Sequence, residues 1–146
     1  MKIVIACDPN AMEFKDQLRQ FIVGLGHECE DYGSEDPIYA NTAFRVAQDV
    51  ADGKFERGIL LCGTGIGMGI AANKVQGAYA ATVSNVYQAQ RAQLSNNANI
   101  LTMGAQVIGI ELAKCLVKEY LACAYDPRSR SGPKVERILN YEKGQK

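Results

Sequence analysis

The chain has 146 residues, with 16 basic and 16 acidic side chains, 47% hydrophobic residues and 22% charged residues. This length suits one domain with a single core and excludes two full-sized domains. The balanced charge excludes the strongly basic surface typical of proteins that bind nucleic acid or acidic membranes, and no segment approaches the roughly 20 apolar residues of a membrane span. We therefore expect one packed domain, residues 1–146, that binds neither nucleic acid nor membrane.

The five cysteines are odd in number and show neither a C-x-x-C motif nor Cys/His pairs at zinc-ligand spacing. We interpret them as reduced thiols. The opening segment, MKIVIACDPN, enters a short strand-like run without the longer apolar stretch and cleavage site of a signal peptide. These features predict a cytoplasmic protein.

Short apolar runs alternate with amphipathic segments along the whole chain. The first run, residues 2–8, precedes a segment, 14–25, whose apolar residues share one helical face. The pattern recurs at 27–32 with 39–52, 57–62 with 66–75, 78–83 with 86–95, and 100–103 with 111–122. Five alternating strand–helix units predict a doubly wound, Rossmann-like α/β fold: a five-stranded parallel sheet inside a three-layer αβα sandwich.

The last segment, residues 126–146, is basic and interrupted by proline and glycine before a helix-like run at 134–141. It predicts a C-terminal arm that leaves the sandwich and lies at a subunit interface. Ligands of open parallel sheets bind beyond the carboxyl ends of the strands. The site is therefore expected in the loops that follow the five strands, at 8–12, 33–36, 62–69, 84–86 and 103–109.

The loop after the third strand, CGTGIGMG at residues 62–69, contains G-x-G-x-G between a strand and a helix. Glycines let a ligand approach the backbone, and a helix N-terminus offers N–H groups to an anion. The loop lacks the lysine of a P-loop, and it opens the third unit rather than the first, unlike a dinucleotide fingerprint. Such glycines equally suit a tight turn. The presence of Cys62 favours a functional role for this loop over a purely structural one. A thiol beside a helix N-terminus is favoured as a thiolate, which can act as a base.

The sequence resembles the ribose-5-phosphate isomerase B and galactose-6-phosphate isomerase family of aldose–ketose isomerases over nearly its whole length. The resemblance rests on Cys7-Asp8, the block ILLCGTGIGMGIAANKVQG at 59–77, the segment SNNANILTMGAQVIGIELAK at 95–114, and an Arg-bearing C-terminal arm. It implies a Rossmann-like fold, no metal or organic cofactor, and a phosphorylated monosaccharide as substrate. It also implies a homodimer or homotetramer whose active sites take residues from two subunits.

The resemblance further implies roles for individual residues. Cys62 matches the catalytic base, which moves a proton between C1 and C2 through a cis-enediol, and Thr64 matches the hydroxyl beside it. Asp8 matches the acid that contacts substrate hydroxyls. The backbone of residues 65–69, with Asn96, matches the hole that holds the enediolate. The implied substrate-binding residues are Gly63, Gly65, Ile66, Gly67, Met68, Gly69, Ser95, Arg130 and Lys134.

Several functional positions depart from the family pattern. Ribose-5-phosphate isomerases of this type have active-site histidines where this chain has Pro9, Ser95 and Ser131. Two family arginines are replaced by Gln106 and Lys134. The active-site histidines of the family are thus all absent, whereas the cysteine base is retained.

The serine at position 95 favours an open-chain substrate. Ribose 5-phosphate is mostly a furanose, so its isomerase needs an acid–base group that opens the ring before the C2 proton moves. A tetrose 4-phosphate cannot close that ring, because the hydroxyl that would close it carries the phosphate. Segments 36–41 and 94–98 look like the erythrulose-4-phosphate isomerase branch, so the expected pair is D-erythrose 4-phosphate and D-erythrulose 4-phosphate.

Three other interpretations are considered from the sequence. The chain is a ribose-5-phosphate isomerase in which Ser95 and water open the ring, or it is one subunit of a hetero-oligomeric enzyme such as galactose-6-phosphate isomerase. Retention of Cys62, Thr64 and Asn96 argues against a catalytically inert subunit. A nucleotide-binding module of flavodoxin-like shape is disfavoured, because the ribose-binding acid expected after the second strand is missing.

Overall fold

The computed structural model describes residues 1–33 and 35–145. Residues 34 and 146, which belong to the expected loop 33–36 and arm 126–146, lie outside that part. The strands are β1 (Lys2–Cys7), β2 (Glu28–Asp31), β3 (Arg57–Cys62), β4 (Ala80–Thr82) and β5 (Ile100–Gly104). The helices are α1 (Met12–Gly24), α2 (Tyr39–Ala51), α3 (Ile66–Ala72), α4 (Val86–Leu94), α5 (Ile110–Ala122) and α6 (Gly132–Glu142), with a 3-10 turn, η1, at Pro9–Ala11.

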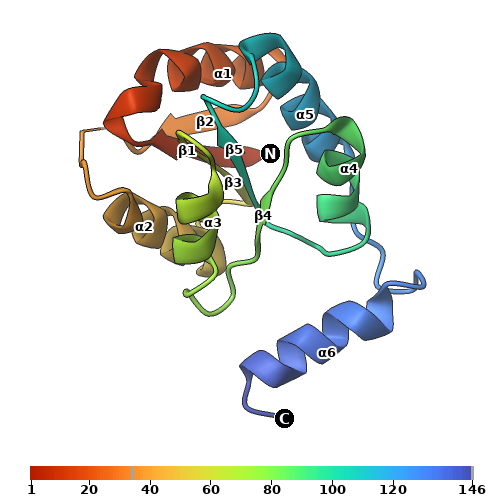
Figure 1. Ribbon diagram of the computed structural model, residues 1–146. Helices are drawn as coiled ribbons and strands as arrows, with labels where there is room; N and C mark the ends of the chain where they lie inside the picture. Colours follow the sequence, from red (N-terminus) through yellow and green to blue (C-terminus); the bar gives the residue numbers. More distant parts are fainter. Residues whose placement is uncertain (34, 146) are drawn as a thin grey trace.

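The strands form one parallel sheet in the order β2-β1-β3-β5-β4. Helices α1, α4 and α5 cover one face of this sheet, and α2 and α3 cover the other (Figure 1). Successive residues of the central strands enter opposite clusters: Ile59 and Leu61 pack under α1, α4 and α5, whereas Leu60 and Cys62 pack under α2 and α3. Burial on both faces explains the continuous apolar runs, and the predicted doubly wound three-layer fold is confirmed.

Two elements on the side of β4 are shorter than the sequence predicts. Helix α3 ends at Ala72 rather than at residue 75, and β4 has three residues rather than six. After α3 the chain turns more tightly, with the Lys74 N–H donating to the Ala71 carbonyl at 3.0 Å and the Val75 N–H to the Ala72 carbonyl at 3.1 Å. Just before β4, the Tyr79 N–H donates to the Asn99 side chain at 2.8 Å instead of to a neighbouring strand.

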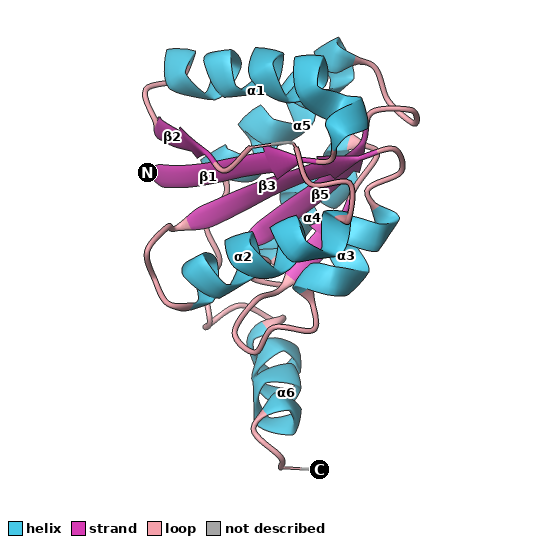
Figure 2. Cartoon of the chain, turned by 90° about the vertical axis from the view of Figure 1, so that its left-hand side faces the viewer, coloured by secondary structure: helices cyan, strands magenta, loops and turns pink. Residues whose placement is uncertain are grey.

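The C-terminal arm leaves the sandwich as expected. Figure 2 shows α6 projecting away from the three layers. The arm touches its own domain through Glu142, whose carboxylate accepts from the Gly77 N–H at 3.2 Å and from the Tyr79 hydroxyl at 2.5 Å. That the arm lies on another subunit stays a prediction. Within the described residues, no helix is both long and apolar enough to cross a membrane.

Candidate active site

The chain reverses its direction of winding between β1 and β3. Strand β2 lies on one side of β1, and β3 lies on the other, so a crevice is expected where the carboxyl ends of β1 and β3 meet. Cys7 is paired with Leu61, and the Asp8 N–H donates to the Leu61 carbonyl at 3.1 Å. The backbone of Asp8 therefore lies beside the end of β3, which carries Cys62. That both residues act on one substrate stays a prediction. The Asp8 carboxylate also accepts from the Asn10 N–H at 3.0 Å.

Cys62 is the last residue of β3 and is only 6% exposed. Its Sγ accepts a hydrogen bond from the Gly65 N–H at 3.0 Å. Gly65 has a φ of +79°, and a Cβ there would lie 2.8 Å from the carbonyl carbon of Met103. Glycine is therefore required for the turn that brings an amide onto the sulfur. Thr64, in the same turn, is exposed, and its hydroxyl accepts from the Ile66 N–H at 3.2 Å.

Two of the predicted anion-binding glycines have a close neighbour that explains them. A Cβ on Gly67 would lie 2.4 Å from the ring of Tyr39, the first residue of α2. A Cβ on Gly69 would lie 2.7 Å from the Thr82 hydroxyl. Tyr39 therefore lies across the loop, and sequence reasoning missed it because the contact joins segments 28 residues apart. Anion binding by residues 65–69 stays a prediction.

The loop after β5 holds this turn from the other side. The Ala105 N–H donates to the Cys62 carbonyl at 2.9 Å, and the Gln106 N–H donates to the Gly63 carbonyl at 3.0 Å. The Gln106 side chain lies against Gly63, where a Cβ would be 3.2 Å from its Oε1. A neutral amide therefore lies beside the cysteine turn. We call Asp8, Cys62 and residues 63–69 the Cys62 group.

The remaining predicted residues gather elsewhere. A cavity of about 320 Å³ is lined by Ser95, Asn96, Arg130 and Lys134, together with Tyr87, Arg91, Ser131, Val135 and Ile138. We call the first four residues the Arg130 group. They come from two segments, the turn between α4 and β5 and the C-terminal arm. Substrate binding by Ser95, Arg130 and Lys134 stays a prediction, and so does the role of Asn96 in the enediolate hole.

Buried Gln93 connects those two segments. Its Nε2 donates to the Ala98 carbonyl, and its Oε1 accepts from the Tyr125 N–H, both at 2.9 Å. The first bond holds the turn that carries Asn96, and the second holds the start of the arm that carries Arg130. The geometry of the Arg130 group therefore depends on this amide.

A single chain does not bring the two groups together. Cys62 pairs with Gly104, the last residue of β5, whereas Asn96 precedes the first residue, Ile100, which pairs with Gly58. The Cys62 group thus lies at the carboxyl ends of the strands, and Asn96 lies near their amino ends. The two are separated by about the length of β5, on the order of 13 Å.

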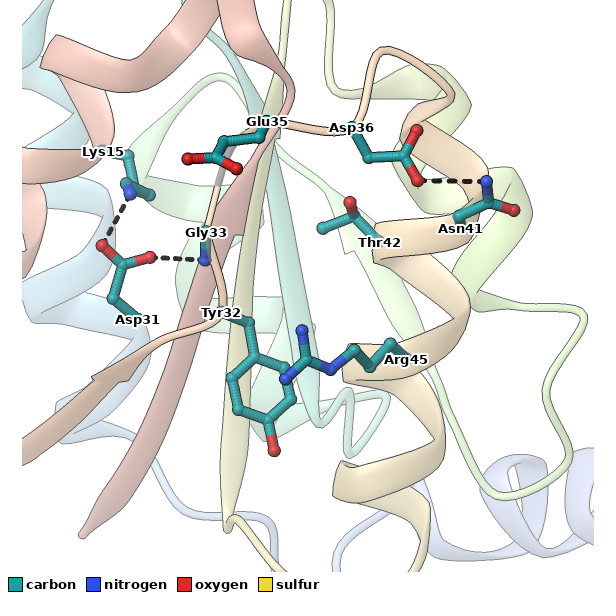
Figure 3. A pocket seen from close by; sticks show the side chains of 9 residues that line it. All are labelled: Lys15, Asp31, Tyr32, Gly33, Glu35, Asp36, Asn41, Thr42 and Arg45. Atoms are coloured by element: carbon teal, nitrogen blue, oxygen red, sulfur yellow. Dashed lines mark hydrogen bonds and ion pairs between the residues drawn. The ribbon is translucent and has the colours of Figure 1, made fainter.

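A further cavity, of about 530 Å³, opens at the carboxyl end of β2 (Figure 3). It is lined by Lys15, Asp31, Tyr32, Gly33, Glu35, Asp36, Asn41, Thr42 and Arg45. The loop at 33–36 was expected from the sequence as a ligand-binding loop, whereas Lys15 and Arg45, which come from α1 and α2, were not expected. The Arg45 guanidinium lies 4.1 Å from the centre of the Tyr32 ring.

The Lys15 ammonium is buried and lies 2.6 Å from Asp31 Oδ2. Burial alone would lower the pKa of Lys15, but the hydrogen bond and charge of Asp31 outweigh burial, so that this pKa is raised. Burial alone would raise the pKa of Asp31, but the hydrogen bonds from Lys15 and the Gly33 N–H lower it. This ion pair forms one wall of the cavity. Over residues 1–33 and 35–145, no three His, Cys, Asp or Glu side chains are grouped as a metal site would need.

A model of the Ribose/Galactose Isomerase family matches residues 3–138. The chain belongs to this family. The resemblance and the enzyme class expected from the sequence are thereby confirmed. The Cys62 group and the Arg130 group both lie inside the matched range. Their roles in an active site stay predictions.

Similar proteins include both substrate types that the sequence analysis weighed. The D-erythrulose-4-phosphate isomerase 2 of Mycolicibacterium smegmatis is 44% identical over 148 residues, covering 97% of each protein. The D-erythrulose-4-phosphate isomerase of Pectobacterium atrosepticum is 43% identical and covers 100% of this chain and 98% of its own. The solved structure of Clostridium thermocellum ribose-5-phosphate isomerase B has a TM-score of 0.92 at 36% identity, with 100% of both chains covered.

Proposed function

We propose that this chain is a cofactor-independent aldose–ketose isomerase of a small sugar phosphate, with D-erythrose 4-phosphate and D-erythrulose 4-phosphate as the favoured pair. The observation that carries the proposal is the position of Cys62 at the winding reversal of the sheet, beside Asp8 and under the Gly65 N–H. The family membership supports the reaction type. The names of the two erythrulose-4-phosphate relatives support the four-carbon substrate.

In the proposed reaction, Cys62 acts as a thiolate and takes the proton from C2 of the aldose. The electron pair of that C–H bond forms the C1–C2 double bond, and the carbonyl electrons move to the C1 oxygen, which gives a cis-enediolate. The thiol returns the proton to C1, and the carbonyl forms at C2. The hydroxyl proton on the C2 oxygen passes to the C1 oxygen, and Thr64 and Asp8 are the polar side chains at that edge suited to relay it.

We further propose that the site is completed by a second copy of the chain. An isologous dimer that sets the Arg130 group of one protomer against the Cys62 group of its partner contains two complete sites. Arg130 then holds the substrate phosphate, since its planar fork binds two oxygens at once. The exposed apolar side chains of Ile66 on α3 and Ile138 on α6 support such pairing, because Ile66 belongs to the Cys62 group and Ile138 lines the cavity of the Arg130 group.

Ser95 supports the preference for an open-chain tetrose phosphate over ribose 5-phosphate. A serine cannot replace the acid–base function of a histidine at the ring oxygen, and an open-chain tetrose phosphate does not need that function. The ribose-5-phosphate reading is the second candidate, and it is favoured by the likeness to the C. thermocellum structure.

The test is an isomerase assay of the purified chain on erythrose 4-phosphate, erythrulose 4-phosphate and ribose 5-phosphate. We expect a much higher kcat/KM on the tetrose pair, and we expect Ser95→His to raise activity only on ribose 5-phosphate. A wild-type preference for ribose 5-phosphate would refute the four-carbon assignment. Activity that appears only after a second, unlike subunit is added would favour the hetero-oligomeric alternative instead.

A further inference from the structure

Two threonine hydroxyls lie behind the cysteine turn, away from the proposed substrate. Thr102, in the middle of β5, is completely buried, and its hydroxyl donates to the Gly65 carbonyl at 2.8 Å. The Thr82 hydroxyl, from β4, lies 2.7 Å from the Thr102 hydroxyl and 3.3 Å from the Gly65 carbonyl. Each hydroxyl has one proton to donate. When Thr102 donates to the Gly65 carbonyl, the shorter of the two contacts, it accepts from Thr82; in the other arrangement Thr102 donates to Thr82 and Thr82 donates to Gly65.

In both arrangements a hydroxyl donates to the residue that contacts the sulfur. Gly65 donates its N–H to Cys62 and presents its carbonyl to Thr102. Glycine has the widest backbone freedom of any residue, so its own conformation does not fix the direction of that N–H. The Gly65 carbonyl also accepts from the Gly69 N–H at 3.1 Å, at the start of α3. The shorter bond from Thr102 adds a side-chain donor that restricts the rotation that would turn the Gly65 N–H away from the sulfur.

The residues around Thr82 and Thr102 leave room for the two hydroxyls and provide a hydrogen-bond partner. Gly69 leaves room for Thr82, whose Oγ1 would lie 2.7 Å from a Cβ at that position. Thr102 lies between the apolar Leu101 and Met103 in β5, where valine would fill the same volume. A hydroxyl at such a position has to be satisfied by a partner, and here the partner is the Gly65 carbonyl.

We propose that Thr102 is a positioning residue for Cys62: its hydroxyl holds Gly65 so that the Gly65 N–H stays on the sulfur. The inference rests on the proposed function, in which that sulfur is the base. Thr82 is not needed while Thr102 holds Gly65, but its hydroxyl lies 3.3 Å from the same carbonyl and can replace that of Thr102 when Thr102 is changed.

The test combines kinetics with a chemical probe of the sulfur. Thr102→Val keeps the shape of the side chain and removes the hydroxyl, and Thr82→Val/Thr102→Val also removes the hydroxyl that could take its place. We expect kcat to fall roughly 10-fold in the double variant with KM changed less than about 2-fold, because a misplaced catalytic group slows the chemical step rather than binding. Thr102→Ser, which keeps the hydroxyl, should have the kcat of the wild type.

Alkylation of Cys62 by iodoacetamide, followed by peptide mass spectrometry, gives a readout that needs no turnover. Its rate should differ several-fold between wild type and the double variant, because the Gly65 N–H that contacts the sulfur is no longer held in place. The exposed Cys115 in the same sample should react at an unchanged rate. Thr82→Val alone is the matched control, since Thr102 keeps its bond to Gly65, and its kcat should stay within about 2-fold of wild type.

Wild-type kcat and wild-type Cys62 alkylation in a folded double variant would overturn the positioning role. If the valine variants do not fold, Thr102→Ala compared with Thr102→Ser repeats the comparison at a smaller volume, with the same two readouts. A wild-type protein without isomerase activity would refute the proposed function instead. The alkylation comparison would still decide whether Thr102 controls Cys62.

Discussion

Cys62 has a donor on its sulfur and a carboxylate at the end of the neighbouring strand, and both follow from the backbone of a parallel sheet. The strand register places Asp8 beside Cys62, and the left-handed Gly65 folds its amide back onto the sulfur. The glycine pattern therefore has two uses at the residue scale. Gly65 shapes the cysteine turn, whereas Gly67 and Gly69 make room for Tyr39 and Thr82.

Cys62→Ser tests the proposed base. Serine keeps the shape of the side chain and an acceptor for the Gly65 N–H, but its hydroxyl stays protonated at neutral pH. Loss of a general base typically lowers the rate by about 10²–10⁴-fold, and we expect a fall of this size in kcat. Steady-state kinetics measure the effect, with circular dichroism as the folding control. Turnover close to that of wild type would move the role of base away from Cys62.

At the scale of elements, the ion pair between Lys15 on α1 and Asp31 on β2 stabilises the packing of α1 beside β2. Removing one partner of a buried pair leaves an uncompensated charge, which costs about 3–5 kcal/mol when both groups are fully buried. The Asp31 side chain is 31% exposed, so we expect Asp31→Asn to lower the free energy of unfolding by about 1–2 kcal/mol. The matched control is Asp16→Asn, because Asp16 contacts the same ammonium at 3.4 Å with a 59% exposed side chain.

The pH dependence of this effect has a definite sign. The pKa of Asp31 is lowered from 3.8 in the folded state, so the pair stabilises the fold above the unfolded-state pKa and loses that contribution as pH falls through the folded-state value. Urea unfolding should therefore show the difference between wild type and Asp31→Asn at neutral pH and a smaller difference below about pH 4. An equal difference at both pH values would mean that the variant acts through packing rather than charge.

At the scale of the whole molecule, the two groups at opposite edges of the sheet predict complementation between variants. Cys62→Ala removes the base, and Arg130→Ala removes the proposed phosphate ligand, so each variant alone should have low kcat/KM. In a mixed dimer with shared sites, one site carries both changes and the other carries neither. The isolated mixed dimer should therefore have about half of wild-type activity, and an unfractionated random mixture about a quarter.

The complementation is measured after co-refolding two differently tagged variants and isolating the mixed species. Cys62→Ala mixed with Cys62→Ser is the control, since neither chain supplies a base and no activity should return. Isolated mixed dimers of Cys62→Ala and Arg130→Ala without any regained activity would show that each site lies within one chain.

The amino-acid sequence by itself determined the fold class and the order of the elements, and it singled out Cys62 as the proposed base. These features depend on local periodicity and on a contiguous motif at 62–69, which are visible within a short window of the chain. Only the tertiary structure decided the strand order, the placement of Tyr39 across Gly67, the hydrogen bond from Thr102 to Gly65, and the distance between Cys62 and Asn96. Those features depend on contacts between segments far apart in the sequence, which periodicity does not encode and which packing of the helices on the sheet sets.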